Sequence, residues 1–363
     1  MNSLVKKTLK CALRPLVRSM SRMCSILQKE LQESPHLAEG SGRTQKCSDS
    51  PFRIDPNFFT SNMSENEKKM LFKNNVHYLL IENSSFCNRK CWFCSNRSVD
   101  IKEETQYLSE ELFLKILSEL KTINYSEDLA FALCNEPLSD RRLPKLIETA
   151  KIYLPNVKIH LNTNGDYLNK NLLDDLLASG LDRMLISVYI DEKKPYWSYE
   201  KAKLAVIAMA NKLSLNMEIL SEENQTICQS IGRYMKNSHS LYIVMHSDNH
   251  TATTNDRGGM IPDYTPVNRR GNERRKICVA PFTQFVIYHG GEACACHNLR
   301  PDYPGHKDFI GGSVGTSSIF DIFAGPVYKK FREDMLRLDP PACCSNCPED
   351  IDIAPHYRLI EQA

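Results

Sequence analysis

Residues 87–94 read CNRKCWFC and bring three cysteines close together, with the spacing C-x3-C-x2-C. A structural zinc ion prefers four closed protein ligands, and His77, in an upstream apolar stretch, is the nearby spare. An iron–sulfur cluster held by three thiolates instead leaves one iron without a protein ligand, and such an open position can bind a small molecule. The spacing therefore favours an iron–sulfur cluster, with a zinc site as the alternative.

The composition narrows the class of protein. The chain has 363 residues, 42% of them hydrophobic, which is enough for one large domain and a smaller one. Its 46 Lys and Arg residues nearly balance 44 Asp and Glu residues, so no affinity for nucleic acid is expected. No apolar run of about eighteen residues predicts a membrane span. Fourteen cysteines without a clean signal peptide favour metal ligation in a reducing cytoplasm over disulfides.

Residues 1–32 form a separate basic segment. Apolar residues recur there at helical spacing, and Arg14, Arg18 and Arg22 share another face. A basic amphipathic helix of this kind is expected to pack on the body of the protein or on a partner. Contact with a membrane surface and a mitochondrial transit peptide are the alternatives. Residues 33–69 are interpreted as a linker.

Between residues 77 and 247 the sequence alternates apolar strands with helices. The expected strands are 77–82, 129–134, 157–164, 183–189, 215–220 and 241–247, and the expected helices are 108–123, 141–154, 169–180, 198–213 and 222–237. Six such units predict an α/β fold, a partial (β/α)6 barrel over residues 70–260. In such barrels the chemistry lies at the carboxyl ends of the strands. The three cysteines follow the first expected strand, CNEP (134–137) follows the second and NTNG (162–165) follows the third.

A second group of cysteines lies in residues 261–363, which are expected to form a small separate domain. Cys278 precedes a hairpin signal that turns at Gly290 and Gly291, and a helical stretch over 318–336 leads to CCSNC at 343–347. Cys278, Cys296, Cys344 and Cys347 together supply four thiolates. A zinc ribbon with four cysteine ligands is the alternative to an iron–sulfur cluster. Cys294 and Cys343 are neighbours that could substitute as ligands.

Taken in order, the motifs of the barrel resemble those of the radical S-adenosylmethionine (radical SAM) superfamily. CNEP looks like its Gly-Gly-Glu-Pro segment, which holds the SAM amino group, and NTNG like its Thr-Asn-Gly turn. ISVY resembles its Ile-Ser-Leu-Asp strand end and NDRGG its Arg-Ala-Gly segment; Cys134 and Asn135 replace two glycines, and Tyr189 stands where Asp is frequent. The resemblance implies metal ligands at Cys87, Cys91 and Cys94, and SAM contacts at Phe93, Asn135, Glu136, Pro137, Asn162, Asn164, Ser187 and Arg257.

The C-terminal cysteines resemble the SPASM/Twitch extension of this superfamily in its shorter form, with one auxiliary [4Fe–4S] cluster. The spacing is close to that of members like 2-deoxy-scyllo-inosamine dehydrogenase, which oxidise sugars. The resemblance implies metal ligands at Cys278, Cys296, Cys344 and Cys347. It also implies two [4Fe–4S] clusters and SAM as cofactors, and a reducing electron donor of the flavodoxin or ferredoxin type as a partner.

The function implied is reductive cleavage of SAM to a 5′-deoxyadenosyl radical, which abstracts hydrogen from a substrate carbon. Residues 1–70 show no strand pattern for a leader-binding domain, which favours oxidation or epimerisation of a small carbohydrate-like or aminocyclitol-like substrate. Modification of a ribosomally made peptide is the alternative within the family. An iron–sulfur electron carrier and a zinc-binding scaffold are the alternatives outside it. The sequence assigns no residue to the catalytic step on the substrate.

Overall fold

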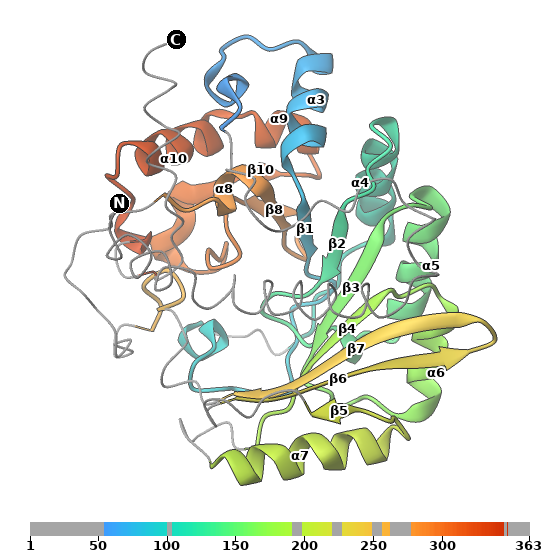
Figure 1. Ribbon diagram of the computed structural model, residues 1–363. Helices are drawn as coiled ribbons and strands as arrows, with labels where there is room; N and C mark the ends of the chain where they lie inside the picture. The colour runs from blue at the N-terminus through green and yellow to red at the C-terminus, as the bar shows by residue number, and fades with distance from the viewer. Residues whose placement is uncertain are drawn as a thin grey trace, which may run out of the picture.

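The computed structural model describes residues 54–99, 104–190, 198–219, 227–248, 256–261, 277–344 and 347. Within these ranges the strands form one ten-stranded sheet with the order β10-β9-β8-β1-β2-β3-β4-β7-β6-β5 (Figure 1). The predicted helix over residues 1–32 lies outside the described residues. No helix in the described part of the chain is both long enough and apolar enough to cross a membrane.

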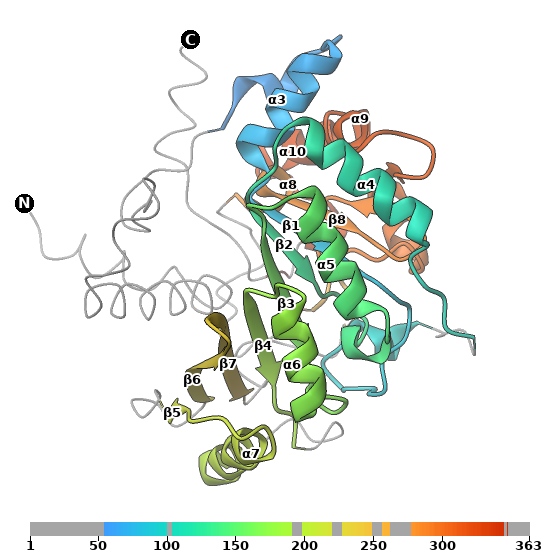
Figure 2. The same ribbon diagram turned by 90° about the vertical axis from the view of Figure 1, so that its right-hand side faces the viewer.

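The centre of the sheet is parallel. Its core strands are β1 (Tyr78–Ile81), β2 (Asp128–Phe131), β3 (Lys158–Thr163), β4 (Arg183–Ser187) and β7 (His239–Asp248), each pairing in parallel with the next. Helices α4 (Glu110–Thr122), α5 (Leu143–Tyr153) and α6 (Lys170–Ala178) connect the first four strands and cover one face (Figure 2). This arrangement confirms the predicted α/β class and the parallel sheet of a partial barrel, because each crossover returns the chain to the same end.

The crossover helices form where the sequence supplies both a start signal and an apolar face. In α4 the Ser109 side chain accepts a hydrogen bond from the Leu112 N–H and so caps the first turn. Phe113, Ile116 and Leu120 recur at intervals of three and four residues and are buried against the sheet. Helix α6 is capped in the same way by Asn169. Capping and apolar spacing therefore select both predicted helices, with ends within two residues of the expected ones.

The predicted helix at 222–237 is wrong where the structure describes it. Residues 227–236 form β6 (Ile227–Lys236), which pairs antiparallel with β7 and with the short strand β5 (Glu218–Ile219). Asn237 and Ser238 join β6 to β7, and both have positive φ, as the two-residue turn of a tight hairpin requires. Gly232 lies so close to the segment before β5 that a Cβ would be 2.9 Å from the Asn216 carbonyl oxygen. The last expected unit is therefore a hairpin, and α7 (Tyr199–Lys212) lies beside it (Figure 1).

The C-terminal part extends the same sheet. Strand β8 (Gln284–Ile287) pairs in parallel with β1, and β9 (Glu292–Cys294) returns antiparallel, which confirms the predicted hairpin. Strand β10 (Ile310–Ser313) follows, and the predicted helical stretch divides into α9 (Ile319–Phe323) and α10 (Pro326–Leu336) because Gly325 and a proline at the first position start a new helix. The boundary at 260/261 remains a prediction, and the sheet is continuous across it.

The predicted linker, 33–69, ends earlier than expected. Its last part contains the 3-10 helix η2 (Pro56–Phe59) and the start of α3 (Glu65–Asn75), which is capped by Ser64 and Glu67 in a capping box. Phe58 is 2% exposed and packs edge-to-face against Phe282 and Phe323. Residues that precede β1 in the sequence therefore complete the core beside the C-terminal helices.

The substitution Phe58→Ala should destabilise the protein by about 3–5 kcal/mol, because it empties a ring-sized volume among Phe282, Phe323 and the Arg332 guanidinium. A lower melting temperature in circular dichroism would show this. The control is Met70→Ala in α3, whose side chain is 50% exposed and whose loss should change stability by less than about 0.5 kcal/mol. Equal melting temperatures for the two variants would contradict the packing of residues 54–59.

Candidate functional site

The first three cysteines lie on the loop that leaves the carboxyl end of β1. Cys91 is buried, and the backbone N–H of Cys94 donates to the Cys91 carbonyl oxygen at 3.0 Å, which closes the C-x2-C segment into a turn. Burial raises the pKa of the Cys87 thiol to about 12, although the backbone N–H of Arg89 bonds to this sulfur and opposes the shift. Three thiols on one loop, two of them in a single turn, are the kind of donor set that an iron–sulfur cluster uses.

The loop is held to the end of β3 by a set of polar side chains. Arg89 donates two hydrogen bonds of 2.6 Å to the Asp166 carboxylate, and Asn88 donates a third at 2.6 Å. The Asn164 amide N–H donates to the Asn88 amide oxygen at 2.8 Å. Burial would raise the pKa of Asp166, but these donors lower it overall, so the carboxylate stays charged. The predicted contact Asn164 therefore positions the cysteine loop.

Phe93, in the cysteine loop, packs against an aromatic residue that follows β4. It is buried, and its ring centroid lies 5.2 Å from that of Tyr189, which follows β4. Ser187 ends β4 and Asn162 lies near the end of β3, and both are partly buried. These strand ends lie at the same edge of the sheet because β3 and β4 pair in parallel. The structure therefore gathers these predicted contacts at one edge.

Glu136 ties two turns of this edge together. Its carboxylate accepts hydrogen bonds from the Thr163 hydroxyl at 2.6 Å, the Asn164 N–H at 2.7 Å and the Leu138 N–H at 3.0 Å. The side chain is 2% exposed, and burial raises its pKa while the three donors oppose the shift. A carboxylate offers about four acceptor positions. Glu136 thus keeps about one position for a ligand, and Pro137 after it is buried at the start of η4 (Pro137–Ser139).

The side chain of Asn135 carries an acceptor that is without a hydrogen-bond partner among the described residues. Its amide N–H donates to the Asn83 amide oxygen at 2.7 Å, which fixes the orientation of the amide group. The Asn135 amide oxygen is buried and has no hydrogen-bond partner within the described residues. A buried acceptor without a partner costs about 1–3 kcal/mol unless a ligand supplies a donor. An ammonium group, such as the amino group of SAM, is a donor of the required kind.

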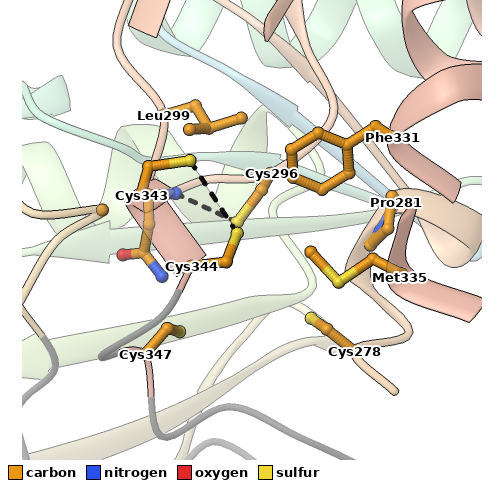
Figure 3. A pocket seen from close by; sticks show the side chains of 11 residues that line it. Cys278, Pro281, Cys296, Leu299, Phe331, Met335, Cys343, Cys344 and Cys347 are labelled. Atoms are coloured by element: carbon orange, nitrogen blue, oxygen red, sulfur yellow. Dashed lines mark hydrogen bonds between the residues drawn. The ribbon is translucent and has the colours of Figure 1, made fainter. Parts of the chain in front are cut away.

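The auxiliary cysteines meet in one pocket. Its lining includes Cys278, Cys296, Cys343, Cys344 and Cys347, together with apolar side chains from α8 (Ala280–Thr283) and α10 (Figure 3). The β8–β9 hairpin brings two of these cysteines together. Cys278 precedes β8 and Cys296 follows β9, so both lie at the open end of the hairpin. The backbone N–H of Cys347 donates to the Cys344 carbonyl oxygen at 3.2 Å and repeats the turn of the first loop. The four predicted ligands are therefore brought together, and Cys343 is a fifth thiol.

The two ambiguous neighbours separate in the structure. Cys343 lies in the pocket, with its sulfur 3.9 Å from that of Cys344. Cys294 lies on β9, is fully buried in the apolar core and is absent from the pocket lining. Burial raises the pKa of the Cys294 thiol well above its usual range. The geometry thus leaves Cys343 as the alternative ligand. None of the ten cysteines whose side chains the structure describes forms a disulfide.

The donor set of the pocket is all sulfur, which a zinc ion and an iron–sulfur cluster both accept. Thiolates that share one zinc ion lie about 2.3 Å from it, so their sulfurs lie within about 4 Å of one another. No three His, Cys, Asp or Glu side chains in the described ranges form a group of that kind. A four-iron cluster is larger, since each thiolate binds a different iron. The backbone N–H of Asn298 donates to the Cys296 sulfur at 3.4 Å, a contact that would stabilise a thiolate there.

Arg300 connects the auxiliary segment to the first loop. Its guanidinium donates to the Asn96 amide oxygen and, at 3.3 Å, to the Ser95 hydroxyl, both just after Cys94. The Ser95 hydroxyl lies 3.2 Å from the Cys134 sulfur, and the Asn96 amide donates to the Cys134 carbonyl oxygen. Charge-assisted hydrogen bonds of this kind are stronger than neutral ones. Sequence analysis missed Arg300, because no local pattern marks a contact across 200 residues.

A buried acid and a histidine were also missed. Glu82 follows β1 and is almost fully buried, and its carboxylate lies 2.6 Å from the His289 Nδ1 atom after β8. Burial opposes protonation of His289, but the bond to Glu82 raises its pKa overall. Glu82 follows β1 directly and His289 follows β8 closely, and these two strands pair in parallel. A position just after a strand was the one feature of the sequence that could have pointed to these residues. The pair can hold a proton at that edge.

The predicted contact Arg257 lies against the auxiliary segment. Its guanidinium donates to the Asn298 amide oxygen at 3.3 Å, and its φ of 51° is in the left-handed region. His306 is fully buried and holds the same turn: its Nδ1 accepts from the Arg300 N–H at 2.9 Å and its Nε2 donates to the Gly258 carbonyl oxygen at 2.8 Å. Burial lowers the pKa of His306 and keeps it neutral. The barrel's last turn is therefore attached to the cysteine pocket.

Two family models match the chain. Residues 81–208 match the radical SAM superfamily, and residues 278–348 match an iron–sulfur cluster-binding domain called SPASM. These two domains imply a [4Fe–4S] cluster, SAM and an auxiliary iron–sulfur cluster, as the sequence predicted.

Similar proteins agree with these matches. The chain is 22% identical over 270 residues to the S-adenosyl-L-methionine-dependent 2-deoxy-scyllo-inosamine dehydrogenase of Niallia circulans, covering 74% of this chain and 90% of that one. It is 29% identical over 161 residues to an uncharacterized protein of Methanocaldococcus jannaschii, covering 44% of this chain and 49% of that one. The crystal structure of BtrN in complex with AdoMet and 2-DOIA shares the fold, with a TM-score of 0.52, 19% identity and coverage of 75% of this chain and 92% of that one.

Iron analysis of single-cysteine variants separates ligands from neighbours. Protein purified without oxygen should carry about eight irons per chain. Cys278→Ala and Cys296→Ala should lose about half of this iron, because each removes a thiolate of the auxiliary pocket. Cys294→Ala is the matched control and should keep all of it, since Cys294 lies in the apolar core. Cys343→Ala should keep all of the iron as well. If this variant lost half of its iron, Cys343 rather than Cys344 would be the ligand.

Proposed function

We propose that this protein oxidises a small carbohydrate-like or aminocyclitol-like substrate. The premise is that the chain is a member of the radical SAM superfamily with a C-terminal iron–sulfur cluster-binding domain. Radical SAM chemistry alone fixes neither the substrate class nor whether the substrate is oxidised or epimerised. A reductant is needed for such chemistry, and a flavodoxin-type or ferredoxin-type protein is the proposed donor.

The residues present fit the implied cofactors. Cys87, Cys91 and Cys94 would hold the first cluster, and Asn135 and Glu136 would receive the SAM amino group. When bound, these groups supply a 5′-deoxyadenosyl radical by one-electron cleavage of a sulfur–carbon bond. Arg89 and Asp166 hold the cysteine loop against the end of β3 and so fix where that reactive carbon can lie. The chain's own contribution is therefore positioning.

One observation carries the direction of reaction, namely the auxiliary pocket of thiols joined to the first loop through Arg300. Oxidation of a secondary alcohol to a ketone removes one hydrogen atom, one proton and one electron from the substrate. The electron needs an acceptor within the protein, and the auxiliary site supplies one. The His289–Glu82 pair at the sheet edge supplies a group that can take a proton. Similarity over 90% of a dehydrogenase supports the same direction.

The spare thiols favour oxidation over epimerisation. An epimerase must return a hydrogen atom to the substrate, which a free thiol beside the radical can supply. Cys134 is buried against the Ser95 hydroxyl, and burial raises its pKa to about 11. Cys294 lies in the core and Cys343 in the auxiliary pocket, while the side chain of Cys228 lies outside the described residues. No spare thiol that the structure describes is exposed at the barrel edge.

Glu136→Gln should weaken SAM binding about tenfold or more while cluster content stays unchanged. The carboxylate of Glu136 accepts from the Thr163 hydroxyl and from two backbone N–H groups. A glutamine would place an NH2 group, which can only donate, against one or more of these donors. The turn that receives the SAM amino group would therefore shift. Equilibrium dialysis of SAM against protein with intact iron content measures the effect. Thr163→Val is the matched control, because it leaves the charge of the carboxylate in place while removing a hydroxyl that donates to Glu136 and accepts from the Gly165 N–H. Its SAM affinity should fall less than that of Glu136→Gln. Wild-type affinity in Glu136→Gln would assign the amino group to Asn135 and backbone atoms.

The reaction itself can be tested with aminocyclitols and sugars as candidate substrates, in deuterated water and with a chemical reductant. Oxidation predicts a product two hydrogens lighter than the substrate, with one 5′-deoxyadenosine formed per product and no deuterium on carbon. The product should be the same when Cys134, Cys228, Cys294 or Cys343 is changed to Ala. The combined Cys87→Ala, Cys91→Ala and Cys94→Ala variant should form no 5′-deoxyadenosine. Deuterium on a substrate carbon that disappears in one cysteine variant would establish epimerisation instead.

A further inference from the structure

We propose that Asn298 donates a hydrogen bond from its side-chain amide to the auxiliary cluster and thereby raises the reduction potential of that cluster. Asn298 follows Cys296 by two residues and lines the cysteine pocket. The inference rests on the auxiliary cluster alone and is independent of which substrate is oxidised. No family motif singled out this position.

The amide nitrogen of Asn298 has no other use in the described part of the chain. The residue is 5% exposed, and its Nδ2 atom is buried without a hydrogen-bond partner there. A buried donor that stays unpaired is unfavourable, so this nitrogen requires an acceptor. The other residues that line this pocket are mainly cysteines, namely Cys278, Cys296, Cys343, Cys344 and Cys347, and apolar side chains (Figure 3). Sulfur of a thiolate or of a cluster is the acceptor that this pocket offers.

The orientation of the amide is set from its other end. The Arg257 guanidinium donates to the Asn298 Oδ1 atom at 3.3 Å, and a guanidinium can only donate. The oxygen must therefore face Arg257, which leaves Nδ2 as the end that is without a protein partner. Gly258 packs against the backbone of the same residue, since a Cβ there would lie 2.9 Å from the Asn298 carbonyl oxygen. Arg257 and Gly258 are thus positioning residues for this amide.

The sign of the effect follows from charge. Reduction adds one electron to the cluster and makes its sulfur atoms better acceptors, so a donor stabilises the reduced state more than the oxidised one. Hydrogen bonds to cluster sulfurs are among the factors that set these potentials. The backbone N–H of Asn298 already bonds to the Cys296 sulfur, so the side chain adds a second donor from the same residue. An electron leaving a substrate radical would then find a more favourable acceptor.

The test compares full-length proteins that carry both clusters. Asn298→Leu keeps the approximate side-chain volume and removes both polar atoms. At a fixed applied potential, the ratio of reduced to oxidised auxiliary cluster should be about tenfold lower in this variant than in the wild type. For one electron this corresponds to a midpoint lowered by about 59 mV. A redox titration followed by electron paramagnetic resonance measures it, and the Cys87, Cys91 and Cys94 to Ala variant identifies the auxiliary signal. Met335→Leu changes the pocket lining without touching a donor and should leave the midpoint at its wild-type value.

A second measurement needs no variant and decides the matter if Asn298→Leu fails to hold its cluster. Wild-type protein is grown with asparagine labelled with nitrogen-15 at the side chain only, and the reduced auxiliary signal is examined for coupling to that nucleus. A coupling is expected from Asn298, because the backbone nitrogen that bonds to Cys296 stays unlabelled. Absence of the coupling would overturn the proposal. An unchanged midpoint in an iron-replete Asn298→Leu protein would overturn it equally.

Discussion

Parallel pairing of β1 to β4 is the constraint on which the first site depends. Because each crossover helix returns the chain to the same end, the segments after these strands meet at one edge of the sheet. The backbone hydrogen bonds fix how far apart the loops lie, and the side chains of Glu136, Asn164 and Arg89 then lock them together. A cofactor that needs ligands from several turns can be held only if those turns stay in register.

Much of this could be predicted from the sequence, and the reason is local. The C-x3-C-x2-C loop, the capped helix over 110–122 and the hairpin at Gly290 and Gly291 each carry their signal within a few residues. The hairpin of β6 and β7 was missed because residues 222–237 also suit a helix, and a two-residue turn at Asn237 is a weak signal beside that pattern. Tertiary pairing overrode the local preference there.

The contacts that join the two cysteine groups could not be predicted, because they link residues far apart in the chain. Arg300 bonds to Ser95 and Asn96, and Arg257 bonds to Asn298. Buried polar groups of this kind are stable only when each finds a partner, so they specify one arrangement of the loops and disfavour others. The sequence shows polar and charged residues at these positions but not which of them become buried.

Strand β8 also sets an order of events while the chain is being made. It pairs with β1, yet it begins about 200 residues later in the sequence. At about 5–20 residues per second, a ribosome needs roughly 10–40 s to cover that distance. During this time one edge of β1, with its apolar Leu79, Leu80 and Ile81, has no strand beside it. Chaperone protection of nascent chains should therefore matter most in the interval before β8 leaves the ribosome, and C-terminal truncations should aggregate rather than fold as a smaller barrel.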